Sequence, residues 1–76
     1  MTFMLLATLT LFNGNIVHAT HVETWSTLTQ CVEYVEQHHL SLETELQSRT
    51  QRVYGEPAKF IHLNCGEEEE VRSYMP

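Results

Sequence analysis

Positive charge is scarce in this chain, and aspartate is absent from it. Its four basic residues, Arg49, Arg52, Lys59 and Arg72, stand against ten glutamates, so the formal net charge is −6. Proteins that bind nucleic acids need clustered positive charge to neutralise the phosphates. Because the chain has no basic stripe and no glycine-rich phosphate loop, we expect no nucleic-acid binding. An acidic surface is instead compatible with a basic protein partner.

Long apolar runs and metal-binding motifs are also missing. The apolar stretch over residues 3–12 is about half as long as a transmembrane helix requires, so no stable membrane span is predicted. The two cysteines form no C-x₂₋₄-C pair, and Glu36 and His39 have no second pair that would complete a metal site. Nothing supplies the oriented third group that a cysteine nucleophile needs. The sequence therefore predicts no metal and no cofactor, nominates no catalytic residue and indicates a protein that is not an enzyme.

Residues 2–25 admit two interpretations, in a chain whose 76 residues allow one domain at most. In the first interpretation, Asn13-Gly14 is a type I′ turn between two strands of a β-hairpin. Side chains alternate between two faces along a strand. This alternation predicts a strand over 3–12 with its most apolar face inward, and a more polar second strand over 16–25.

In the second interpretation, residues 1–19 are a secretory signal peptide. The stretch 3–12 has the length of a signal core, and Val17-His18-Ala19 fits a cleavage site after Ala19. Against this, the N-terminus carries no Lys or Arg, and the remaining chain would bury little apolar surface for a stable domain. The hairpin is favoured, with a cytoplasmic location, and a secreted or periplasmic protein is the alternative.

A long amphipathic helix is predicted over 27–54. Thr27 and Gln30 form a capping-box pattern at its start, and Gly55 and Pro57 end it. A helix of this length spans about 40 Å, whereas a ten-residue strand spans about 33 Å. Either one end projects from the sheet or the helix breaks near Leu40-Ser41. Spacings of three, four and seven residues define its apolar stripe: Leu28, Val32, Val35, His39, Leu42, Leu46 and Val53.

Residues 58–65 alternate as a third strand, with Cys65 on its inward side. Cys31 borders the apolar stripe of the helix, so both sulfurs point into the same layer. We therefore expect a Cys31–Cys65 disulfide, with two buried thiols as the alternative. The expected fold is α+β: a small ββαβ unit in which an N-terminal β-hairpin and a third strand pack on one long helix. Its expected core comprises Leu5, Leu9, Val32, Val35, Ile61 and Leu63.

After Gly66 the chain reads EEEEVRSYMP, which is strongly acidic. We expect a single domain over 1–66, followed by a flexible acidic tail over 67–76. The expected contact with a protein partner is the run Glu67, Glu68, Glu69 and Glu70, whose charge would suit a basic partner. The other interpretation of this run is a solvated end that keeps a small protein soluble.

The order of strand, glycine turn, strand, helix and cysteine-ended strand resembles a loose group of very short, uncharacterised phage and prophage proteins. The matching residues are Gly14, the segment Trp25-Ser26-x₄-Cys31, and Cys65. The long helix and the glutamate-rich tail depart from that pattern. The resemblance implies a compact ββαβ unit and no particular activity. Two functional hypotheses remain: a small acidic, non-catalytic protein-binding module, such as a phage-type modulator or inhibitor of a host protein, or a secreted, disulfide-closed protein with residues 1–19 removed.

Overall fold

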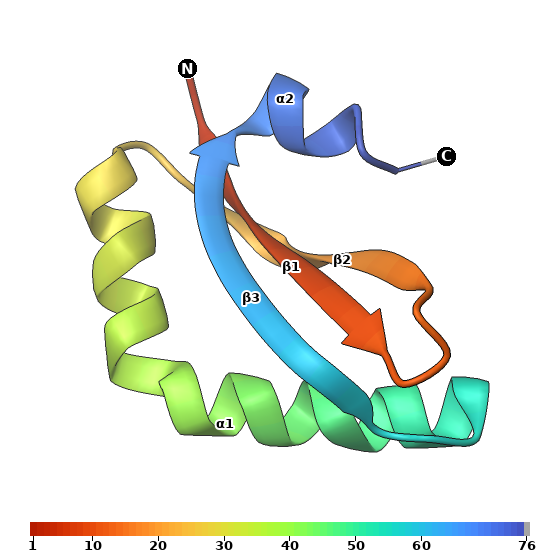
Figure 1. The fold of residues 1–76 in the computed structure, drawn as a ribbon. Helices are drawn as coiled ribbons and strands as arrows, with labels where there is room; N and C mark the ends of the chain where they lie inside the picture. The colour runs from red at the N-terminus through yellow and green to blue at the C-terminus, as the bar shows by residue number, and fades with distance from the viewer. Residues whose placement is uncertain (76) are drawn as a thin grey trace.

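A computed structural model describes residues 1–75 as three strands and two helices (Figure 1). In chain order these are β1 (Phe3–Leu11), β2 (Ile16–Trp25), α1 (Leu28–Tyr54), β3 (Ala58–Glu67) and α2 (Glu68–Arg72). The strands form one antiparallel sheet in the order β2-β1-β3. The predicted α+β fold with a ββαβ unit is therefore confirmed, and α2 follows it at the C-terminal end.

The first strand lies at the centre of the sheet because both of its faces are apolar. Leu5, Ala7 and Leu9 are buried on the face that packs against α1. Ala58, at the start of the neighbouring strand β3, packs with Ala7 and Leu9. Met4 and Leu6 are buried on the opposite face, where they contact α2. A strand covered on both sides is expected to read as a continuous apolar run. The charge-free N-terminal stretch is therefore the centre of the fold.

The hairpin between β1 and β2 is confirmed, but its turn differs from the predicted one. Gly14 has a φ of 89°, whereas Asn13 does not have a positive φ. A type I′ turn requires positive φ at both of its central residues, so that prediction is wrong. The side chain of Asn13 instead accepts a hydrogen bond from the backbone N–H of Asn15 at 2.9 Å. This local bond stabilises the turn with only the glycine in the left-handed region.

The long helix α1 is capped at the predicted residues. The hydroxyl of Thr27 accepts a hydrogen bond from Gln30 N at 3.2 Å, and Ser26 donates back to the Gln30 side chain. Gly55, with a φ of 79°, closes the C-terminal end. The backbone leaves helical geometry at His38 (φ −117°, ψ 16°), two residues before the predicted break. The two halves of α1 therefore run in different directions beside the sheet (Figure 1).

The buried side of α1 agrees with the predicted stripe at Val35, Leu42 and Leu46 and departs from it in the first turns of the helix. Cys31 and Leu42 are buried, whereas Val32 is 40% exposed and so does not belong to the core. The physical reason is that Cys31 is bonded to Cys65 of β3 and so faces the sheet, which leaves the adjacent Val32 facing away from it. Leu28 and Val53, at the two ends of the predicted stripe, are also exposed.

The rest of the predicted core lies in the layer between α1 and the sheet. Leu5 and Leu9 are buried there. Val35, Ile61 and Leu63 are half-buried and pack against these central residues. Alternation along the strands therefore identified the correct inward face of β1 and of β3.

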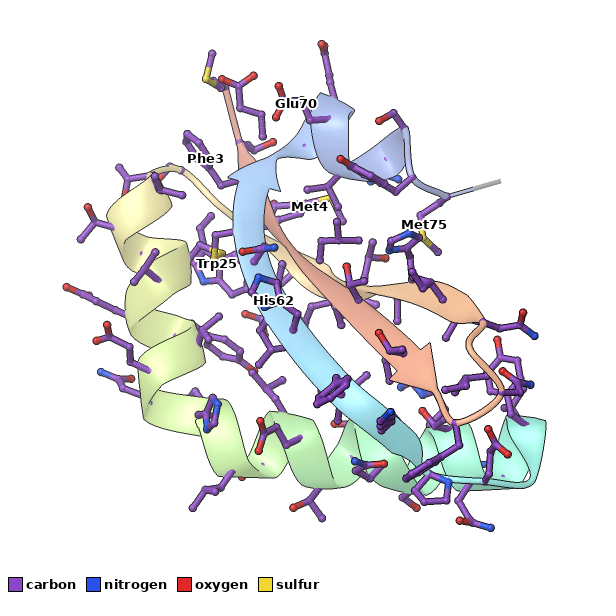
Figure 2. All side chains as sticks on the ribbon, viewed as in Figure 1. Phe3, Met4, Trp25, His62, Glu70 and Met75 are labelled. Atoms are coloured by element: carbon purple, nitrogen blue, oxygen red, sulfur yellow. A yellow bond between two sulfur atoms is a disulfide. The ribbon has the colours of Figure 1, made fainter. Side chains whose placement is uncertain are left out.

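The short helix α2 covers part of the sheet face opposite α1, called the outer face below. Val71 of α2 is 3% exposed and packs on Met4 and Leu6; Figure 2 shows Met4 beneath this helix. The predicted domain boundary at residue 66 does not mark the end of the folded unit, because Val71 is part of its packing. The helix Glu68–Arg72 stands where a flexible tail was expected.

Candidate interaction surfaces

The predicted disulfide joins Cys31, in the first turn of α1, to Cys65 of β3. Their Cα atoms lie 6.1 Å apart, within the range that a disulfide can span. Cys31 is completely buried, and Leu5 packs against it. Both cysteines are used in this bond, so neither offers the free thiolate that nucleophilic chemistry requires.

The predicted contact residues Glu67–Glu70 span the end of β3 and the first turn of α2. The Glu68 carboxylate accepts hydrogen bonds from the Thr2 hydroxyl and, at 2.8 Å, from Arg72. Its backbone N–H donates to the Thr2 carbonyl at 2.9 Å. Glu70 is exposed and points away from the sheet (Figure 2). One glutamate of the run thus anchors α2, and the exposed ones are free to meet a partner.

The Thr2 hydroxyl, and after it Arg72, hold the pKa of Glu68 below its ordinary value. A carboxyl whose pKa is lowered by folding stabilises the fold above its unfolded-state pKa, and this contribution is lost as pH falls through the folded-state pKa. Acid should therefore loosen α2. Replacing Thr2 by Val should raise the pKa of Glu68, measured by NMR titration of its carboxyl carbon, whereas Thr2→Ser should leave it low. An equally low pKa in Thr2→Val would contradict this assignment.

Four aromatic rings join β2 to the first half of α1. Tyr34 is their centre: its ring centroid lies 5.0 Å from that of Trp25, 5.3 Å from that of His21 and 4.4 Å from that of His38. The Tyr34 hydroxyl also lies 3.3 Å from Nε2 of His21. Sequence reasoning missed this cluster, because it assembles across an irregular part of the β1–β2 register and the break in α1.

The side chain of Gln47 connects α1 to the start of β3. Its Oε1 accepts a hydrogen bond from Ala58 N at 2.8 Å, and its Nε2 donates to Ala58 O at 3.1 Å. Ala58 is 5% exposed, so few other partners can reach its backbone groups. Sequence periodicity gives no sign of this bridge.

Replacing Gln47 by Ala should destabilise the protein by about 1–3 kcal/mol, because it leaves two buried backbone groups without partners. Urea denaturation followed by circular dichroism would measure this loss. The matched control is Gln51→Ala, since Gln51 bonds the exposed carbonyl of Gly55 at 3.1 Å. The control should change stability much less, and an equal loss in both variants would show that the Ala58 bridge contributes nothing special.

Neither a metal-binding cluster nor a membrane-spanning helix is found in residues 1–75. No group of three or more metal-ligating side chains comes together there. His39, paired with Glu36 in the sequence reasoning, instead lies 3.3 Å from Glu43. No described helix is both long and apolar enough to cross a bilayer.

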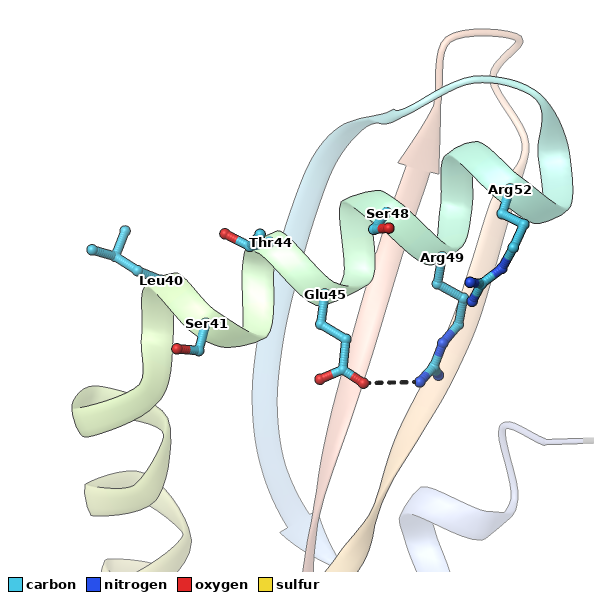
Figure 3. A pocket seen from close by; sticks show the side chains of 7 residues that line it. All are labelled: Leu40, Ser41, Thr44, Glu45, Ser48, Arg49 and Arg52. Atoms are coloured by element: carbon cyan, nitrogen blue, oxygen red, sulfur yellow. Dashed lines mark hydrogen bonds and ion pairs between the residues drawn. The ribbon is translucent and has the colours of Figure 1, made fainter.

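An open hollow of about 550 Å³ lies along the second half of α1 (Figure 3). All its lining residues fall between Leu40 and Arg52, and Arg49 is bonded across it to Glu45 at 3.2 Å. Ligand sites normally enclose most of the ligand within a concave pocket. One helix alone lines this hollow, so it provides no such enclosure.

Comparisons with family models, with curated proteins and with solved structures found no match to this chain. The resemblance to short phage and prophage proteins therefore rests on the sequence pattern alone.

Proposed function

We propose that this protein is a small acidic, non-catalytic protein-binding module whose contact surface includes the exposed glutamates of α2. The observation that carries the proposal is the docking of α2, in which Val71 is buried and Glu68 is bonded to Thr2 and Arg72. A docked helix holds its exposed carboxylates in place before a partner arrives. Binding then costs less ordering than it would for a flexible tail.

The charge distribution favours a basic partner. Of the four basic residues, Arg49 and Arg72 are paired with glutamates, and Lys59 lies with its Nζ 5.4 Å from the Phe60 ring. In the described part of the chain Arg49 and Arg52 lie on α1, Lys59 on β3 and Arg72 on α2, so the basic side chains make no continuous stripe for phosphates. A modulator or inhibitor of a host protein, of the phage type, is the narrower form of this proposal.

Two features of the structure agree with a non-catalytic role: the bonded cysteines and the shape of the hollow along α1. The cysteines are joined to each other, which removes both thiols as nucleophiles. The hollow in Figure 3 is lined by α1 alone, so no second element could hold a substrate against it.

The test is a pull-down from the native host at low and high salt, with association rates measured for each captured protein. The double variant Glu69→Gln/Glu70→Gln should slow association, and salt should slow it in the wild type by screening. The control is Glu33→Gln/Glu36→Gln, which changes the net charge equally on exposed positions of α1.

Two results would count against this proposal. Equal slowing in both double variants would mean that net charge alone matters and that α2 is no specific contact. Unchanged association in the α2 variant would mean that these glutamates are only a solvated end.

The alternative is a secreted or periplasmic protein, and the disulfide is the observation that favours it. Disulfides persist in oxidising compartments and are rare in cytosol, which weighs against a cytoplasmic location. However, removal of residues 1–19 would delete β1, the strand that pairs with both β2 and β3. A secreted form with this fold would have to keep those residues. The intact mass of the protein from its native host separates cleavage after Ala19 from retention.

A further inference from the structure

A second hollow, called the Trp25 hollow, lies where the end of β2 meets the first half of α1. It has a volume of about 410 Å³ and is lined by β2, by the loop that follows it and by α1. Trp25 and Tyr34 form its apolar part, with ring centroids 5.0 Å apart. Both rings are half-buried and pack on the cluster of Leu5 and Cys31; Figure 2 shows Trp25 between the sheet and the first half of α1. The rings are therefore held in place before any ligand arrives.

The polar side chains of the Trp25 hollow offer both hydrogen-bond donors and acceptors. The Oε1 atom of Gln30 accepts hydrogen bonds from the backbone N–H and from the hydroxyl of Ser26, at 3.2 and 3.0 Å. These bonds fix the amide, so its Nε2 remains as a donor. Glu33 and Gln37 also line the hollow; they are exposed and lie on one side of α1, one turn apart. The Glu33 carboxylate adds acceptors, and the Gln37 amide adds one group of each kind.

This combination disfavours three classes of ligand and favours a fourth. A cation such as an arginine side chain has no acceptor for the Gln30 amide. An anion would meet Glu33 and a chain of net charge −6. An apolar molecule would cover the polar groups without pairing them, which costs free energy. A sugar ring has C–H groups on its faces for the aromatic rings, and the hydroxyls around its edge both donate and accept.

We propose that the Trp25 hollow binds a neutral pyranose sugar, with one face of the ring on Trp25 and its hydroxyls bonded to Gln30, Glu33 and Gln37. A ring of the glucose type, whose hydroxyls are all equatorial, has the flattest C–H faces for this contact. The volume lies near the lower end of the range for small-molecule sites, which suits a single ring. The hollow is open, but a sugar keeps its outward hydroxyls in water and so needs less enclosure than an apolar ligand. We therefore expect weak binding of a monosaccharide, with a dissociation constant on the order of 1–10 mM.

Trp25 is the only tryptophan of the chain, so its fluorescence reports binding directly. Titration with methyl β-glucopyranoside should change the emission of the wild type saturably, whereas glycerol at the same concentrations should not. The double variant Glu33→Ala/Gln37→Ala should weaken sugar binding about fivefold or more, because it removes two hydrogen-bonding groups. The matched control, Glu36→Ala/Leu40→Ala, makes the same charge change at the same spacing on exposed positions of α1 outside the hollow. It should bind the sugar as the wild type does, and circular dichroism melts check that both variants fold.

Proton NMR of the sugar gives a second readout that needs no variant. Its C–H protons should shift upfield on binding to the wild type, because they lie over the ring of Trp25. The inference is overturned if these shifts are absent, if glycerol changes the emission equally, or if both double variants bind equally well. Tighter binding of N-acetyl-arginine amide or of N-acetyl-prolinamide than of the sugar would also overturn it and would identify a peptide as the ligand. The helix α2 lies over the outer face, on the other side of the sheet, so Glu69→Gln/Glu70→Gln should leave sugar binding unchanged whether or not it slows association with a protein partner.

Discussion

Replacing Cys31 and Cys65 together by alanine should lower the free energy of unfolding by about 3–4 kcal/mol. The bond closes a loop between residues 34 apart in sequence, and in the chain-entropy model it stabilises the fold by restricting the unfolded chain. A domain of this length has a total stability of about 4–11 kcal/mol. The variant should therefore lose a large part of its stability, measured as a shift of the urea midpoint.

The loss should appear first in the N-terminal half of α1. In this half only Cys31 is buried, while Tyr34 and Val35 are half-buried. The helix breaks at His38, so this segment can open without disturbing the second half. Amide hydrogen exchange should therefore speed up over residues 28–38 more than over the second half of α1.

Wild-type protein treated with a dithiol reductant is the control for the alanine variant. It should unfold at nearly the same urea concentration as the variant, since both lack the bond. If the variant and the oxidised wild type share one midpoint, the disulfide adds nothing to stability. If exchange rises uniformly along α1, the bond does not act through this segment.

The architecture followed from two periodicities that are local properties of the chain. Alternation with period two predicted three strands within two residues of their observed ends, and the capping residues Thr27 and Gly55 predicted the ends of α1. The Cys31–Cys65 bond was predictable because the helix stripe and the β3 alternation point to the same layer. These signals need no knowledge of distant contacts.

The helix α2 was missed because its one buried residue depends on distant contacts. Val71 is isolated among charged residues, and its partners Met4 and Leu6 lie at the other end of the chain. Two local signals were present. Glutamates in the first turn favour a helix N-terminus, and Glu68 with Arg72 is an i, i+4 pair. A run of like charges is also typical of a flexible end, and this signal outweighs the other two in the sequence.

The candidate surfaces were less predictable than the elements that carry them. Ile16 and His18 come from β2, Phe60 and His62 come from β3, and only the register with β1 places them in rows. The exposure of Val32 likewise depends on a tertiary contact, because its neighbour Cys31 is the residue that is bonded to β3 and buried. Periodicity shows which residues share a face of their own element, whereas the covering of each face depends on tertiary contacts.

Leu5→Ala should destabilise the protein by about 2–5 kcal/mol, the range for removing a buried leucine side chain. Leu5 is 3% exposed and packs with Cys31 and Leu42 between the sheet and α1. Its removal leaves a cavity where the disulfide holds the helix to the sheet, so the surroundings cannot easily collapse to fill it. Urea denaturation of the oxidised protein would measure the loss.

The matched control is Leu40→Ala, which deletes the same atoms from a side chain that is 77% exposed. It should shift stability by less than about 0.5 kcal/mol. Combining Leu5→Ala with the double cysteine variant tests coupling between the two sites. Without the bond α1 can settle toward the cavity, so Leu5→Ala should then cost less than it does in the oxidised protein. Equal losses from Leu5→Ala and Leu40→Ala would show that the layer between α1 and the sheet is not the core.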